Sequence, residues 1–139
     1  MKRNSSHRPG VFCLEGYWPI PFSAKSTLYK LQQKYGVDFL YKGPVTLNQF
    51  WNGIELWLSE KSKQFPILLL AFHDEPGRIY VGDEAVTLEQ IADFIKGRGA
   101  GKWLHVSSCL TLKINSKRLS KFIADTNLDG VSGYERSIS

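Results

Sequence analysis

Residues 65–73 read FPILLLAFH, and residues 102–109 read KWLHVSSC. Each stretch is an apolar run that ends at a residue capable of covalent chemistry, His73 in the first and Cys109 in the second. Continuous apolar runs are typical of strands that are buried on both faces of a parallel sheet. Functional residues of such sheets gather at the C-terminal ends of the strands. We therefore expect His73 and Cys109 to meet at one edge of a sheet.

The rest of the chain alternates predicted strands with predicted helices. Apolar runs bounded by turn residues predict strands over residues 11–14, 37–41, 67–72, 102–107 and 130–134. Apolar residues at helical spacing predict helices over residues 28–35, 47–58 and 88–95 and after Ser116, and a small hairpin falls at 78–86. The alternation predicts one α/β domain over residues 10–139 with a mostly parallel sheet. Residues 1–9 are predicted to form a disordered tail.

Two of the predicted helices begin with a capping box. Thr46 is followed by Gln49, and Thr87 is followed by Gln90 at the same spacing. In this pattern the threonine hydroxyl and the glutamine amide each bond to a main-chain N–H at the start of the helix. The pattern therefore predicts where both helices start.

The charge of the chain argues against nucleic acid as the main partner. The 139 residues carry a net charge of +5, but the positive residues are scattered apart from the N-terminus and residues 113–121. Scattered charge is typical of a solvated surface. A basic nucleic-acid-binding domain remains the second alternative, and the steep salt dependence of phosphate contacts would reveal it.

Two cysteines, Cys13 and Cys109, are too few for a disulfide framework. Their low number favours a reducing compartment, and we expect a cytoplasmic protein. The longest apolar run, residues 66–72, is too short to span a bilayer, so no membrane partner is expected. The sequence around His73 lacks a second cluster of metal ligands, and no phosphate-binding glycine motif follows a strand. We therefore expect neither a metal nor another cofactor.

A thiol attacks as its thiolate and needs a base or a positive charge nearby, which the imidazole of His73 can supply to Cys109. The alternative is that both residues are structural, because a single cysteine is usually a small buried apolar group. Cys13 lies inside the first predicted strand and is expected in the core. His105 lies four residues before Cys109, about 13 Å along a strand, and is also expected in the core.

The order of these elements resembles the caspase-like cysteine peptidase fold, which metacaspases, separases and bacterial CHAT-type peptidases share. The likeness rests on an apolar strand ending in His73, a hairpin, a helix, and an apolar strand ending in Ser-Cys at Cys109. A Cys-Leu-Glu-Gly strand at 13–16 and a Gly-Tyr strand at 133–134 are most similar to a small bacterial caspase-like family. The resemblance covers residues 11–134.

The resemblance implies a three-layer domain and a hydrolase that cleaves peptide bonds with a thiol. Cys109 would be the nucleophile, and His73 would be the general base and acid. The main-chain N–H groups of Asp74 and Cys109 would form the oxyanion hole. The substrate would be a protein or peptide, a regulatory protein partner would fit the family, and no cofactor is needed.

Two departures from the family pattern favour the first alternative, an inactive caspase-like module that binds a peptide or partner protein. The family usually has glycine after the catalytic histidine, where this chain has Asp74. An aspartate there implies backbone strain, a misdirected N–H and a carboxylate that opposes the oxyanion. The chain also ends at Ser139, just past the fifth predicted strand, where the family usually continues, so the sheet is expected to be truncated.

The substrate pocket of the resembling families lies near the end of the first strand and beside the nucleophile. Glu15 and Ser107 take those positions here, and Trp18 follows in the loop after the first strand. Since neither Glu15 nor Ser107 is basic, cleavage after Asp is not expected. Glu15 could pair with an incoming guanidinium, which predicts cleavage after Arg or Lys. The alternative is that Glu15 accepts a hydrogen bond from a loop.

Overall fold

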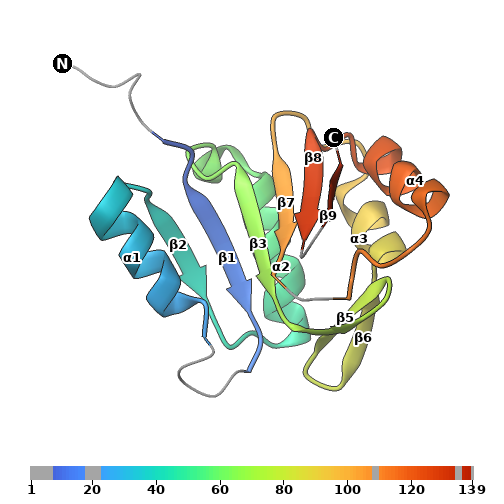
Figure 1. The fold of residues 1–139 in the computed structure, drawn as a ribbon, viewed down its shortest axis with the longest axis horizontal. Helices are drawn as coiled ribbons and strands as arrows, with labels where there is room; N and C mark the ends of the chain where they lie inside the picture. Colours follow the sequence, from blue (N-terminus) through green and yellow to red (C-terminus); the bar gives the residue numbers. More distant parts are fainter. Residues whose placement is uncertain (1–7, 18–22, 108–109, 134–135, 139) are drawn as a thin grey trace.

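The computed structural model describes residues 8–17, 23–107, 110–133 and 136–138, and Figure 1 shows its fold. The larger sheet contains β1 (Val11–Glu15), β2 (Phe39–Lys42), β3 (Ile67–Ala71), β7 (Trp103–Val106), β8 (Gly130–Gly133) and β9 (Arg136–Ile138). The smaller sheet contains β4 (His73–Glu75), β5 (Arg78–Val81) and β6 (Glu84–Thr87). The helices are α1 (Lys25–Tyr35), α2 (Leu47–Leu58), α3 (Leu88–Ile95) and α4 (Ser116–Thr126), with a short 3-10 turn η1 (Glu60–Ser62).

The larger sheet has the strand order β2-β1-β3-β7-β8-β9. All pairs from β2 to β8 are parallel, as the alternation of strands and helices predicted, and β9 is antiparallel to β8. The expectation that the sheet is truncated after the fifth strand is wrong, because β9 adds a sixth. Its three residues, Arg-Ser-Ile, are too short and too polar a run to predict a strand.

Side chains that alternate along β1 divide the core into two parts. Phe12 and Leu14 belong to a large apolar cluster with residues of α2, α3 and α4, whereas Val11 and Cys13 pack with Leu28 of α1. Successive strand residues point to opposite faces, so α1 covers one face of the sheet and the other three helices cover the opposite face. The result is a layered α/β domain.

The helix starts confirm the capping boxes. The hydroxyls of Thr46 and Thr87 each accept a hydrogen bond from the main-chain N–H of the glutamine three residues on. The side-chain oxygen of each glutamine in turn accepts one from the main-chain N–H of the threonine. Within the described residues, no helix is long and apolar enough to cross a membrane.

Candidate active site at the ends of β3 and β7

β3 and β7 lie side by side in parallel, with Ile67 level with Trp103 and Leu70 level with Val106. Paired residues are therefore 36 positions apart, which is also the separation of His73 and Cys109 in the sequence. The predicted parallel neighbourhood of the two strand ends is confirmed. Cys109 itself lies outside the described residues.

The chain passes from β3 into the smaller sheet through Phe72, which is fully buried. The Phe72 ring meets the Phe50 ring of α2 edge to face, with 5.5 Å between their centres. His73 follows as the first residue of β4, exposed to solvent and level with Tyr80 of β5. The predicted hairpin at 78–86 is thus preceded by a further strand that begins at His73.

The Asp74 carboxylate holds the loop that follows β7. One of its oxygens, Oδ2, accepts hydrogen bonds from the main-chain N–H groups of Leu110 at 2.8 Å and Thr111 at 2.6 Å. The same oxygen accepts the Thr111 hydroxyl at 2.7 Å. Thr111 is buried, and hydrogen bonds to a charged acceptor are the stronger kind. Asp74 therefore fixes the chain immediately after Cys109.

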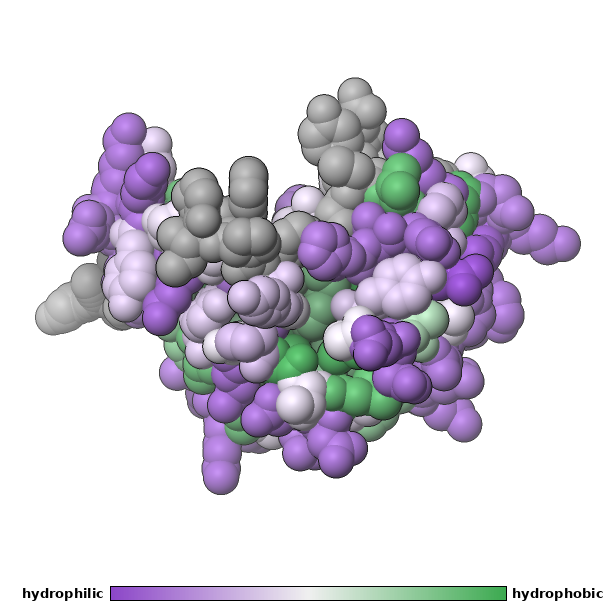
Figure 2. Space-filling model, turned by 90° about the horizontal axis from the view of Figure 1, so that it is seen from below, coloured by the Kyte–Doolittle hydropathy of each residue, from purple (hydrophilic) through white to green (hydrophobic). Residues whose placement is uncertain are grey.

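A second contact fixes the chain before Cys109. The main-chain N–H of Ser107 donates to the Leu70 carbonyl at 3.0 Å, and the Ser107 hydroxyl approaches the same carbonyl at 3.4 Å. Ser107 is exposed at this edge of the sheet. Figure 2 shows the molecule from the side on which the strands end, and hydrophobic residues reach its surface near the centre of that view.

The expectation of backbone strain at Asp74 is wrong. Asp74 lies in β4, paired with Ile79 of β5, and its φ angle is not in the left-handed region. The hairpin already begins at His73, so the next residue adopts extended backbone that any residue tolerates. Its carboxylate is also bonded to the loop, an arrangement that the sequence analysis did not foresee.

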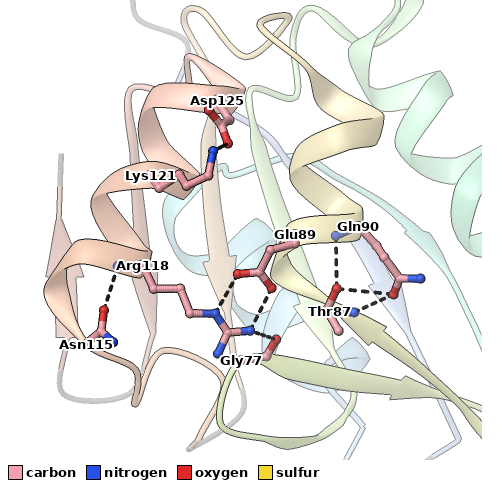
Figure 3. Close-up of polar contacts among 8 residues, drawn as sticks. All are labelled: Gly77, Thr87, Glu89, Gln90, Asn115, Arg118, Lys121 and Asp125. Carbon is pink, nitrogen blue, oxygen red and sulfur yellow. Dashed lines mark hydrogen bonds and ion pairs between the residues drawn. The ribbon is translucent and has the colours of Figure 1, made fainter.

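The turn between β4 and β5 ties this loop to two helices (Figure 3). The N–H of Gly77 donates to the Thr111 carbonyl at 2.9 Å, and the Gly77 carbonyl accepts from Arg118 of α4 at 3.3 Å. Arg118 also holds both carboxylate oxygens of Glu89 in α3, at 2.6 and 2.8 Å. The hydrogen bond from Arg118 lowers the pKa of Glu89. The turn, the loop after β7 and both helices therefore form one connected unit.

Glu15, at the end of β1, is 1% exposed, and its carboxylate already has three donors. They are the Ser23 hydroxyl at 2.6 Å, the Ala24 N–H at 2.6 Å and the Tyr41 hydroxyl at 2.5 Å. Burial, followed by the bond to Glu15, raises the pKa of Tyr41 to about 12. These contacts match the interpretation in which Glu15 accepts hydrogen bonds from a loop. Trp18, a further predicted pocket residue, lies outside the described residues.

Cys13 and His105 both lie in β-strands of the larger sheet, where each packs or bonds to neighbouring elements. Cys13 is fully buried, and burial raises the pKa of its thiol to about 12, which confirms it as a core residue. His105 is half-buried on the face of the sheet, where Nδ1 lies 2.7 Å from the Ser132 hydroxyl. Burial lowers the pKa of His105. Within the described chain, no group of three or more potential metal ligands occurs.

The bonds from the Asp74 carboxylate to the loop, and the part of Thr111 in them, were not predicted from the sequence. A signal was present, since Asp74 and Leu110 are 36 positions apart, the same offset that pairs β3 with β7. A register assigned to the two apolar runs would have placed Asp74 opposite the residue after Cys109. Arg118 and Glu89 gave no comparable signal, because their meeting depends on how α3 and α4 pack.

These features define the class of the protein: an α/β domain with a mostly parallel sheet and an antiparallel hairpin that anchors a loop at its C-terminal edge. The chain belongs to the family of unknown function DUF6642, whose model matches residues 9–139. No curated protein and no solved structure matches the chain.

Proposed function

We propose that the protein is a caspase-like cysteine peptidase in which His73 and Cys109 form the catalytic pair. The order of elements supports this proposal: a strand leading to His73, an antiparallel hairpin, helix α3, and a parallel strand leading toward Cys109. These are the elements on which the resemblance to caspase-like peptidases rests.

The observation that carries the proposal is the attachment of the chain on both sides of Cys109 to the segment that carries His73. Ser107 is bonded to Leu70 before the thiol, and Leu110 is bonded to Asp74 after it. Asp74 directly follows His73 in the sequence. We propose that these two anchors bring the thiol toward the imidazole, and positioning of this kind is a large part of catalysis.

In the proposed reaction, the imidazole of His73 takes the proton from the Cys109 thiol. The sulfur then attacks the carbonyl carbon of the scissile peptide bond, and the imidazolium gives the proton to the leaving amine. Water hydrolyses the resulting thioester, again with His73 as base, and regenerates the thiol. The N–H groups of Cys109 and Asp74 are the proposed donors to the oxyanion.

Glu15 does not support a residue preference for this reaction. Its carboxylate is buried and already accepts hydrogen bonds from Ser23, Ala24 and Tyr41. A guanidinium would have to displace donors that hold the start of α1. We therefore propose hydrolysis by the His73–Cys109 pair without an Arg or Lys preference set by Glu15.

The test is a peptide-library digestion analysed by mass spectrometry. Wild-type protein should cleave some library members, and Cys109→Ala and His73→Ala should each abolish that cleavage. Cys13→Ala is the matched control, because it removes the other cysteine from the core and should leave cleavage intact in folded protein. Cleavage that survives both catalytic substitutions would refute the pair. A library left intact by folded wild-type protein would favour the inactive binding module.

A further inference from the structure

The outer edge of β2 is a feature that the proposed function does not use. β2 pairs with β1 on its inner side, and no other segment of the described chain pairs with its outer side. The N–H of Val11 donates to the Asp38 carbonyl at 3.0 Å. Because a strand in a parallel ladder bonds to a given neighbour through alternate residues, the main-chain groups of Phe39 and Tyr41 face outward.

Positive charge predominates in α1 and β2, and two of their lysines lie at this edge. Residues 25–42 contain four lysines and a single acidic residue, Asp38. The four lysines are all exposed, and they are Lys25, Lys30, Lys34 and Lys42. The Lys25 ammonium lies 5.2 Å from the centre of the Tyr41 ring, and Lys42 belongs to β2 itself. A partner with negative side chains fits the charge of this edge.

A hollow of about 340 Å³ opens beside the end of β2. It is lined by residues 42–45 and by one face of α2, made up of Gln49, Asn52, Gly53 and Leu56. Gly53 lets α2 approach β1 closely, because a Cβ there would lie 2.6 Å from the Leu14 side chain. The hollow combines apolar walls with two amide side chains, so it can accept a side chain of a strand laid along β2.

We propose that the outer edge of β2 binds an extended acidic segment of another protein by strand addition. The segment would pair with the main chain of Phe39 and Tyr41, place acidic side chains beside Lys25 and Lys42, and insert a side chain into the hollow. Lysines at an open sheet edge oppose pairing with uncharged or basic strands, so the same lysines select an acidic one. This surface is independent of the proposed peptidase activity.

The test uses Cys109→Ala protein, which cannot cleave by the proposed route, and a fluorescent peptide of alternating Glu and Val. Fluorescence anisotropy should show binding that weakens by about tenfold or more in the double variant Lys25→Glu, Lys42→Glu. Methylating alternate main-chain nitrogens of the peptide should abolish binding, because a methylated nitrogen cannot pair with a strand. The matched control is Lys61→Glu, Lys63→Glu at η1, which should bind as the parent protein does.

Four results would overturn this proposal. Unchanged binding of the methylated peptide would exclude strand addition, and equal binding of a Lys–Val peptide would exclude selection by charge. If a single-stranded oligonucleotide binds more tightly than the Glu–Val peptide, and its affinity falls in the Lys25→Glu, Lys42→Glu variant, the surface would be assigned to nucleic acid instead. Failure of the Glu–Val peptide to bind folded protein would leave the lysines with edge protection as their only role.

Discussion

Glu15 and Asp74 are two carboxylates that stand near the ends of neighbouring strands and accept three hydrogen bonds each. The donors to Glu15 come from two places, the start of α1 and the side chain of β2 residue Tyr41. The donors to Asp74 all come from two consecutive residues, Leu110 and Thr111. The same chemistry therefore serves two purposes: Glu15 joins elements of the core, whereas Asp74 holds a single loop.

Burial adds a second difference between the two carboxylates. Glu15 is 1% exposed, whereas Asp74 is only partly buried. The donors to Glu15 are themselves partly exposed, but they belong to two elements that its carboxylate joins. Loss of Glu15 therefore leaves donors unpaired and also loosens the contact between the start of α1 and β2. The comparison teaches that Glu15 mainly stabilises the fold and Asp74 mainly orders the loop that carries Cys109.

The largest effect is expected from Glu15→Ala. The substitution removes the acceptor of the Ala24 N–H and of the Ser23 and Tyr41 hydroxyls. It should lower the free energy of unfolding by about 2–5 kcal/mol. Urea denaturation followed by tryptophan fluorescence would measure the loss. Glu55→Ala is the control, because Glu55 is exposed and its removal should leave the denaturation midpoint almost unchanged. Equal midpoints for the two variants would contradict the structural role of Glu15.

A smaller and more local effect is expected from Asp74→Ala. It should cost about 1–3 kcal/mol, because the Leu110 and Thr111 donors can reach water once the loop moves. Hydrogen exchange should show the change directly, with faster exchange of the Leu110 and Thr111 amides and little change in β3. Asp83→Ala, at the exposed turn between β5 and β6, is the matched control. Unaltered protection of the two amides would mean that Asp74 does not hold the loop.

The smallest effect on stability is expected from the protonation of His105. Its side chain contacts a single hydroxyl, that of Ser132, rather than a set of donors. Burial lowers the pKa of His105 below its usual 6.5, so the unfolded chain takes up this proton more readily than the folded protein. The stability that neutral His105 contributes is fully present above the pKa of this residue in the unfolded chain, and it is lost as the pH falls below that value. Because one proton is involved, the contribution of His105 to the free energy of unfolding should change by less than about 1.4 kcal/mol per pH unit. Urea midpoints between about pH 8 and pH 5 should fall less in His105→Asn than in wild type; a parallel decline would contradict this role.

The sequence predicts the elements that depend on local patterns. The apolar run of β3 and the capping box at Thr46 are set by neighbouring residues, and both appear as expected. β4 and β9 were missed because they are short and polar, and they form through pairing with β5 and β8. Such pairing depends on tertiary contacts that a local pattern does not contain.

The position of the candidate site could be predicted from the sequence, but the hydrogen bonds that hold the segments around it could not. The parallel pairing of β3 with β7 followed from two apolar runs, and it brings the segments around His73 and Cys109 to one edge. The Asp74 and Glu15 carboxylates each accept three hydrogen bonds, and the donors lie 8 to 37 positions away in the sequence. For Asp74 the family pattern pointed to strain, whereas the actual contacts depend on where the hairpin begins.

The most direct test of the central claim, that the anchored loop holds Cys109 beside His73 as a reactive thiol, is the rate of alkylation by iodoacetamide. Peptide mass spectrometry can follow Cys109 and Cys13 separately across a range of pH, in wild type, His73→Ala and Asp74→Ala. Cys13 is the internal control, because it is buried and its pKa is raised to about 12.

We predict that Cys109 in native wild-type protein reacts much faster than Cys13 and remains reactive below the ordinary thiol pKa of about 8.5. His73→Ala should slow the reaction and move its pH midpoint up toward that value, and Asp74→Ala should slow it to a lesser degree. Equal labelling of both cysteines in folded protein, or a Cys109 rate unchanged by His73→Ala, would contradict the account.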